Sequence, residues 1–383
     1  MESNAAMIPA GRSTLRETPT LPGQVVLVLQ GGGALGSYQA GVYQALHETG
    51  IEPDWVVGTS IGAINGAMIA GNRPAERLDC LRRFWCGVTR CGLSPLIGPY
   101  SAAGDTFHKL TVLINGLPTF FEPQPSAWLS PHVWLGAEVA AYYSPAPLRA
   151  SLAKLVDFAY LNENHMRLTV GTVNVRSGSL RYFTNRDTTL GLEHVLASAA
   201  LPPAFPAVRI DGESYWDGGI YSNTPIEVVL DDSPRRDSVI FAVQLWPAEG
   251  PEPQTIWQVI SRQKDIQYAS RVESQMARQR QIHRLRRVIR ELAQYIPPGE
   301  RELPAVKELL QWGCGTTMQV IQLKAPRMDG DDYAKDFDFS AARMQARWEA
   351  GYRATARMLE LAPWEGKLDP VEGIGVYELV PAP

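Results

Sequence analysis

Two apolar, strand-like segments near the start of the sequence each run directly into glycines and then into a helical pattern. Residues 25–30 are mostly Val and Leu, and a glycine-rich stretch over 31–36 leads into helical spacing over 37–49. Residues 54–58 form a second short strand pattern, followed by helical spacing over 61–70. Strands that alternate with helices in this way predict a mostly parallel sheet with helices packed on it.

The glycines at 31–36 have the spacing G-x-G-x-x-G, which is typical of a dinucleotide-binding turn. The same backbone would equally hold an oxyanion, since any anion is stabilised by N–H groups that converge at a helix N-terminus. A dinucleotide site needs an acid at the carboxyl end of the second strand, but Glu52 and Asp54 stand before that strand or at its first residue. Ser60 stands at that end instead. The sequence therefore favours an oxyanion hole.

Ser60 lies in a G-x-S-x-G motif, between Gly58 and Gly62, where a strand turns into a helix. This is the context of a nucleophilic serine held in a strained turn, where larger side chains would crowd it. A serine there could also simply cap the following helix. The strand before and the helix after favour the nucleophile.

A serine nucleophile needs a base. None of the six histidines lies in a glycine-rich or strand-end setting typical of a catalytic loop; they are His47, His108, His132, His165, His194 and His283. Asp217 is the better candidate, because it follows two aromatic residues and precedes Gly218 and Gly219, which leave its carboxylate uncrowded.

Three motifs, 31–36, 58–62 and 217–219, stand in the order found in the patatin-like phospholipase family, which the chain resembles over about residues 21–230. Residues 197–206 also resemble the stretch that precedes the catalytic aspartate of that family. The resemblance implies a three-layer α/β/α fold with a mostly parallel central sheet. It also implies hydrolysis of fatty-acyl esters of lipids without a metal or cofactor.

Carried over residue by residue, the resemblance makes Ser60 the nucleophile, which forms an acyl-enzyme, and Asp217 the base. The oxyanion hole is expected from the backbone at Gly31, Gly32, Gly33 and Ala34. The remaining motif glycines are Gly36, Gly58, Gly62, Gly218 and Gly219. Two alternatives stay open: a carboxylesterase or acyltransferase acting on small soluble esters, and a nucleotide- or lipid-binding module without turnover.

The chain divides by composition into three expected parts. Residues 1–22 are polar and lack the apolar core of a signal peptide, which predicts a disordered tail. Residues 23–247 are expected to form the catalytic domain, within which the proline- and aromatic-rich segment 93–147 is either an irregular insertion or a flap. Residues 248–383 resemble a mainly helical extension of one bacterial branch of the family, with 318–324 as a strand that could join the sheet.

The overall composition limits partners and location. The 383 residues carry a net charge of −4, which argues against a general nucleic-acid binder. No apolar run reaches the length of about 18 residues that spans a bilayer. The four cysteines form no C-x-x-C pair, which favours unpaired thiols in a reducing compartment. We therefore expect a cytoplasmic protein, with peripheral membrane association as the alternative.

Six arginines fall between Arg278 and Arg290 without an intervening acid. A helix of this kind can dock on anionic lipid headgroups. It can also be a solvated face or a contact between subunits through the C-terminal helices. The sequence leaves both interpretations open.

Overall fold

The computed structural model describes residues 21–89, 114–117, 119–124, 132, 134–366 and 372–379. Almost all of the expected N-terminal tail and much of the segment 93–147 lie outside these residues. Among the described residues, no helix has both the length and the apolar composition needed to cross a bilayer.

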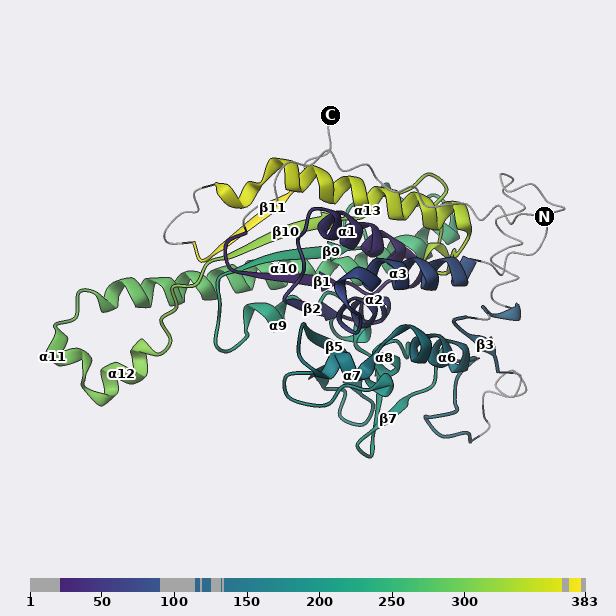
Figure 1. Ribbon diagram of the computed structural model, residues 1–383, viewed down its shortest axis with the longest axis horizontal. Coiled ribbons are helices and arrows are strands. Elements are labelled where there is room, and N and C mark those ends of the chain that lie inside the picture. The colour runs from purple at the N-terminus through teal and green to yellow at the C-terminus, as the bar shows by residue number, and fades with distance from the viewer. Residues whose placement is uncertain are drawn as a thin grey trace.

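A central sheet organises the molecule, and its strands lie side by side in Figure 1. Its order is β11 (Ile374–Glu378), β10 (Met318–Lys324), β9 (Ser238–Gln244), β1 (Gln24–Leu29), β2 (Trp55–Gly58), β5 (Arg167–Asn174), β8 (Glu213–Asp217) and β7 (Val208–Ile210), with β6 (Leu180–Thr184) on β5. From β11 to β5 every neighbouring pair is parallel, whereas β6, β7 and β8 pair antiparallel. The sheet is therefore mostly parallel, as predicted.

Alternating side chains of β1 supply the cores on the two faces of the sheet. Leu27 and Leu29 belong to one apolar cluster, and Val26 and Val28 belong to another. A strand buried on both faces needs helices on both, which explains why residues 25–29 are apolar without interruption.

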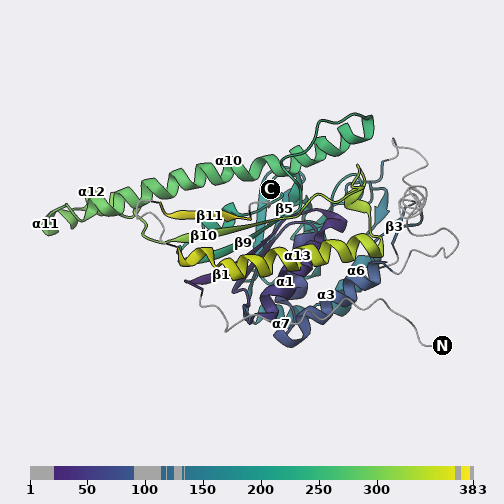
Figure 2. The same ribbon diagram turned by 90° about the horizontal axis from the view of Figure 1, so that it is seen from above.

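Helices cover both faces of the sheet, which gives the three expected layers (Figure 2). The helices packed in the larger core are α1 (Ser37–Glu48), α2 (Ile61–Ala70), α3 (Pro74–Thr89), α6 (Ala146–Leu155), α7 (Phe158–Asn162), α8 (Leu192–Ser198) and α13 (Ala341–Leu361). The opposite face is covered by α9 (Glu227–Leu230) and α10 (Ile256–Ala293). The fold class predicted from the resemblance is confirmed.

Helices α1 and α13 approach each other closely through two glycines. A Cβ at Gly41 would lie 1.9 Å from the carbonyl oxygen of Trp348, and one at Gly351 would lie 2.1 Å from that of Tyr38. The indole of Trp348 also donates to Gln44 at 2.6 Å. This contact fixes the C-terminal helix on the helix that follows the glycine-rich loop.

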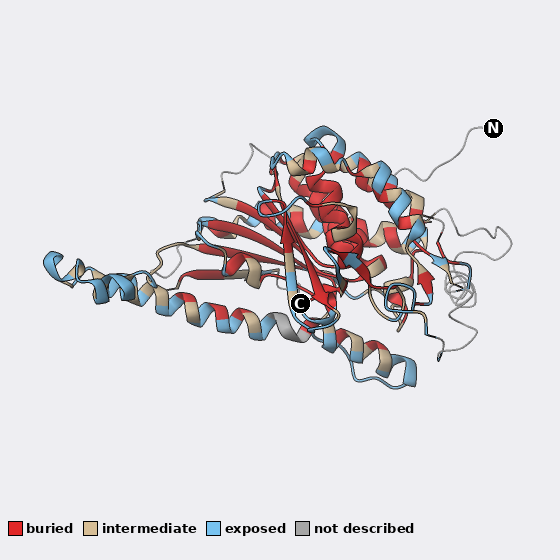
Figure 3. Cartoon of the chain, turned by 90° about the horizontal axis from the view of Figure 1, so that it is seen from below, coloured by how far each residue is buried: buried red, intermediate tan, exposed pale blue. Residues whose placement is uncertain are grey.

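The last third of the chain continues the same sheet. Strand β10 pairs with β9 along its whole length, and β11 pairs with β10 at the sheet edge. The boundary expected at residue 247 falls between β9 and α10 and stays a prediction, because one sheet extends across it. Helix α10 continues beyond the sheet with α11 (Pro298–Arg301) and α12 (Pro304–Leu310), which project from the body and are mostly exposed (Figures 1 and 3).

Part of the segment 93–147 is described, and it packs on the body. Phe120 and Phe121 are buried, and the short strands β3 (Glu122–Pro123) and β4 (Tyr143–Ser144) pair with each other. Residues 90–113, 118, 125–131 and 133 lie outside the described part. The choice between an insertion and a flap therefore stays open.

Candidate active site

Ser60 sits in the sharp turn between β2 and α2. Its backbone adopts φ 56° and ψ −125°, a conformation that is strained for a residue with a side chain. The turn must be tight because β1 lies against it: a Cβ at Gly62 would be 2.2 Å from the carbonyl oxygen of Leu29. The Ser60 N–H donates to the carbonyl oxygen of Ser198 at 3.1 Å, which fixes the turn from the other side.

Strand pairing brings Asp217 to the same place. Gly58 pairs with Val170 on β5, and Asp217 at the end of β8 pairs with Thr172, two residues further along that strand. The Asp217 carboxylate accepts a hydrogen bond from the N–H of Gly219 at 2.7 Å, and it also interacts with the Ser60 hydroxyl, which favours the ionised form of the carboxylate.

Asp217 is only 1% exposed. Burial raises its pKa from 3.8 to about 7, because the ionised carboxylate loses its hydration, and the Ser60 hydroxyl and the Gly219 N–H oppose the shift only in part. A carboxylate with this pKa is a far stronger base than an exposed one.

The glycine-rich loop lies across from this pair, and the structure corrects one expected residue. The Gly31 N–H donates to the backbone oxygen of Asn223 at 3.1 Å, so it is not available to an oxyanion. Among the described residues, no group accepts a hydrogen bond from the N–H groups of Gly32, Gly33 and Ala34. These three remain the candidate donors.

Two side chains that the sequence analysis did not single out hold the loop at its start. The Asn223 amide and the Trp246 indole donate to the carbonyl oxygen of Gly31, at 3.1 and 2.8 Å. Asn223 comes six residues after Asp217, so its place in the sequence could have marked it as a residue near the site. Trp246 follows β9, and nothing in its local sequence marks it.

The motif glycines are required by close packing around Ser60 and Asp217. A Cβ at Gly58 would lie 2.3 Å from the carbonyl oxygen of Gly62, and one at Gly218 would lie 2.5 Å from that of Gly171. At Gly36 it would lie 2.4 Å from a buried Ile61 side-chain atom, and at Gly219 2.9 Å from the Asn223 amide oxygen.

Ser60, Asp217 and residues 31–33 open into one pocket of about 720 Å³, part of it open to solvent. Its walls are mainly apolar and come from segments far apart in the sequence: Ile61, Ile64, Phe120, Phe121, Leu201, Phe205, Phe337 and Phe339. An apolar pocket of this kind beside a serine hydroxyl can hold a hydrocarbon chain.

No histidine among the described residues lines this pocket. His47 contacts Glu52 at 2.5 Å, the His194 ring accepts from the N–H of Gly191, and His283 is buried against the backbone oxygen of Leu230. His108 lies outside the described residues. Within the part of the chain that the structure covers, no three His, Cys, Asp or Glu side chains are grouped to hold a metal ion.

A family model described as patatin-like phospholipase matches residues 27–230, which is more than half of the chain. The chain belongs to the patatin-like phospholipase family. A second model, described as patatin phospholipase, matches residues 266–371. The two matches together include most of α10, all of β10 and α13, and the turns that carry Ser60 and Asp217.

Individual relatives align over parts of the chain. Human patatin-like phospholipase domain-containing protein 6 is 42% identical over 92 residues, 24% of this chain and 6% of that protein. Lysophospholipase NTE1 of Candida glabrata is 49% identical over 243 residues, 62% of this chain and 12% of the relative. The chain thus spans a small fraction of their length. Among solved structures, VipD from Legionella pneumophila aligns with a TM-score of 0.39 and 17% identity, over 88% of this chain and 67% of that one.

Proposed function

We propose that the protein hydrolyses fatty-acyl esters of lipids, with Ser60 as nucleophile and Asp217 as general base. The observation that carries the proposal is that Ser60, in a strained turn, and the buried carboxylate of Asp217 line the same apolar pocket and interact with each other. Membership in the patatin-like phospholipase family supports the same substrate class.

In the first half of the reaction, Asp217 takes the hydroxyl proton as the Ser60 oxygen attacks the ester carbonyl. The carbonyl oxygen becomes an oxyanion, which accepts hydrogen bonds from the N–H groups of Gly32, Gly33 and Ala34. When the tetrahedral intermediate collapses, the ester C–O bond breaks and the leaving alcohol takes the proton from Asp217. The acyl group remains on Ser60.

In the second half, water attacks the acyl-enzyme and gives its proton to Asp217. The same N–H groups stabilise the second oxyanion, and the bond to the Ser60 oxygen then breaks. The proton returns to Ser60, and the fatty acid leaves. An alcohol in place of water would give acyl transfer instead.

Covalent labelling tests the nucleophile. A fluorophosphonate should label wild-type protein at Ser60, identified by mass spectrometry, and should leave Ser60→Ala unlabelled. Ser177→Ala, in the exposed turn between β5 and β6, is the matched control and should be labelled like wild type. Wild-type protein that is neither labelled nor active on any ester would favour the binding module.

The substrate class is tested by chain length. Hydrolysis of p-nitrophenyl esters from acetate to palmitate, alongside lysophospholipids, separates a lipid hydrolase from an enzyme of small soluble esters. We expect kcat/KM to rise with acyl length, because each methylene buried in the pocket adds about 0.8 kcal/mol of binding. A maximum at acetate would support the small-ester alternative, and added alcohols that capture most of the acyl group would support acyl transfer.

For the arginines from 278 to 290, contacts within the chain favour a solvated or subunit-contacting face over lipid docking. Arg280 pairs with Glu372, Arg286 lies 3.8 Å from Asp231, and Arg287 donates to Thr317. Along α10 the segment begins ten positions after Tyr268, roughly 15 Å from this pocket residue, and ends twenty-two positions after it, roughly 33 Å away. Binding to anionic but not neutral liposomes that falls steeply with added salt would instead support lipid contact.

A further inference from the structure

The segment 331–338 packs directly against the glycine-rich loop. A Cβ at Gly33 would lie 2.4 Å from the carbonyl oxygen of Asp336, so backbone meets backbone at this point. Asp336 and Phe337 also line the pocket. The region matched by the second family model therefore touches the candidate oxyanion donors.

Arg347, on α13, joins this segment to the loop. One end of its guanidinium lies 3.4 Å from the carbonyl oxygen of Ala34 and donates to that of Asp338 at 3.0 Å. The other end donates to the carbonyl oxygen of Lys335 at 3.0 Å. Arg347 is 3% exposed and lies 3.7 Å from Asp331, so its guanidinium interacts with these buried groups rather than with solvent.

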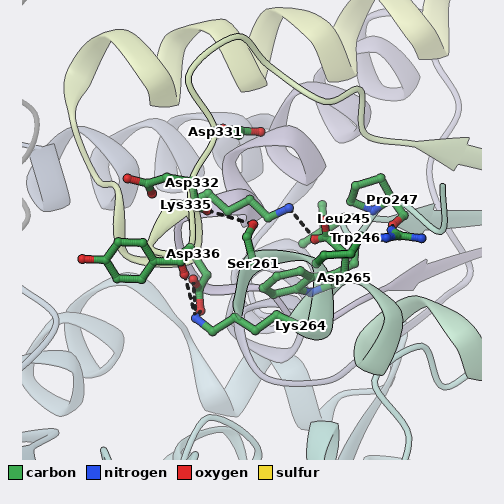
Figure 4. A network of polar contacts seen from close by, with 12 residues as sticks. Leu245, Trp246, Pro247, Ser261, Lys264, Asp265, Asp331, Asp332, Lys335 and Asp336 are labelled. Atoms are coloured by element: carbon green, nitrogen blue, oxygen red, sulfur yellow. Dashed lines mark hydrogen bonds and ion pairs between the residues drawn. The ribbon is translucent and has the colours of Figure 1, made fainter. Parts of the chain in front are cut away.

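Ion pairs and hydrogen bonds connect the segment 331–338 to α10, as Figure 4 shows. Lys335 and Asp265 form an ion pair at 2.5 Å, and both side chains are buried. Lys264 donates to the Asp336 carboxylate at 2.9 Å, and Ser261 donates to the backbone oxygen of Asp332 at 3.3 Å.

Lys335 of the Lys335–Asp265 pair also lies near the residue that holds the start of the glycine-rich loop. The Lys335 ammonium lies 5.3 Å from the ring of Trp246, whose indole N–H donates to Gly31. The loop is thus held at Gly31 through Trp246 and at Ala34 through Arg347, with the segment 331–338 between them. A buried ion pair is often no more stabilising than apolar packing, so its role here is better explained by the geometry that it fixes.

We propose that Arg347 is a positioning residue for ester hydrolysis, and that the Lys335–Asp265 pair holds the segment through which it acts. Arg347 holds the carbonyl group of Ala34, which directly follows the N–H groups of Gly33 and Ala34 in the chain, and so restrains the turn that aims them. This inference rests on the proposed function of those groups as oxyanion donors. Such donors must lie within a few tenths of an ångström of the developing charge, and a 1 Å displacement can slow a reaction about 10²-fold.

The test compares Arg347→Met and Arg347→Lys with wild type on p-nitrophenyl butyrate and palmitate. Each rate is divided by the number of sites that a fluorophosphonate labels at completion, so unfolded protein does not count. For Arg347→Met we expect kcat per labelled site to fall about 10²-fold on both esters, with KM within threefold of wild type. Arg347→Lys keeps the charge and should recover part of this loss.

Arg357→Met is the matched control, because Arg357 lies exposed on the same helix and pairs only with Glu360 among the described residues. It should leave kcat unchanged. The double variant Lys335→Met/Asp265→Leu replaces the buried pair with apolar groups and should keep the fold. We expect it to lower kcat about tenfold with little change in KM.

Two results would overturn the inference while leaving Ser60 in its role. One is a folded Arg347→Met whose kcat per labelled site stays within threefold of wild type. The other is a loss that appears in KM and depends on acyl length, which would assign Arg347 to the pocket wall. If Arg347→Met does not fold, kcat per labelled site and KM are measured for Arg347→Lys and for the double variant instead. Values of kcat that stay at the wild-type level in both would overturn the inference. Wild-type protein without labelling or activity contradicts the proposed function itself.

Discussion

The hydroxyl of Ser60 interacts with the carboxylate of Asp217, although the two residues follow strands of opposite direction. Strand β8 runs antiparallel to β5, so its last residue lies two positions beyond the level at which β2 ends. One antiparallel strand in a mostly parallel sheet thus places a carboxylate beside the strained serine.

The pH dependence of kcat/KM should report the titration of Asp217. Only the ionised carboxylate can take the serine proton, and burial raises its pKa to about 7. We therefore expect kcat/KM to rise about tenfold per pH unit below 7 and to level off above it. The profile is measured with a neutral ester between pH 4.5 and 9. A plateau that already begins at pH 5 would contradict a buried base.

Asp217→Asn should stabilise the protein at pH 8. The folded-state pKa lies above the unfolded value of 3.8, so folding disfavours the ionised form. The contribution of Asp217 to the free energy of unfolding is therefore most favourable below pH 4. It falls as the pH rises to about 7 and stays constant above. The pKa shift corresponds to a destabilisation of at most about 4 kcal/mol at pH 8, and the uncharged amide of Asn removes this destabilisation.

Thermal unfolding at pH 4 and pH 8 checks this prediction. We expect a higher Tm for Asp217→Asn at pH 8 and little difference at pH 4. Asp211→Asn makes the same chemical change at an exposed turn where φ is +49°, a conformation that asparagine also tolerates, and should leave Tm nearly unchanged. A lower Tm for Asp217→Asn at pH 8 would mean that its carboxylate is stabilised rather than strained.

Gly33→Ala should lower kcat by about 10²–10³-fold, the usual effect of losing an oxyanion donor. Gly33 has φ +54°, and a methyl group there collides with the backbone at Asp336. Gly178→Ala is the control: its φ is +67°, so it carries the same backbone strain, but nothing lies within 4 Å. Equal losses in both variants would trace the effect to strain alone.

Much of this site could be predicted from sequence, because its chemistry sits in local motifs. Ser60 and Asp217 each stand in a short glycine-containing turn. Strands β1 and β2 can be recognised in the sequence by their uninterrupted apolar residues. Gly31 was assigned as a donor because sequence shows which N–H groups are near, but not that one is already bonded to Asn223.

The remainder of the site has no local signature. Trp246, Asp336 and Arg347 reach the glycine-rich loop from later in the chain, through contacts that only the packed sheet and helices create. For the same reason β11 was not predicted. Strand β11 is short, and its pairing with β10 across more than fifty residues decides its conformation.

Phe205→Ala should shift the preference of the enzyme toward longer acyl chains. Phe205 lines the pocket and packs against Phe120 and Phe121, with ring centroids 6.4 and 5.9 Å apart. Removing the ring lengthens the apolar space, so the ratio of kcat/KM for palmitate over butyrate ester should rise roughly tenfold. Trp134→Ala, at a fully exposed position, should leave the ratio unchanged. A falling ratio would mean that Phe205 contacts the acyl chain rather than limiting it.

The most direct test of the Ser60–Asp217 pair compares turnover of one ester by Asp217→Asn, Ser60→Ala and six single His→Gln variants, each corrected for folded protein. In a Ser-His-Asp triad the imidazole takes the proton and the carboxylate only orients it, whereas here the carboxylate itself contacts the serine. We predict that Asp217→Asn falls to nearly the level of Ser60→Ala. Every histidine variant should stay within about tenfold of wild type, since loss of a general base costs 10²–10⁴-fold. A single histidine variant that folds normally but loses activity to the level of Ser60→Ala would contradict the account.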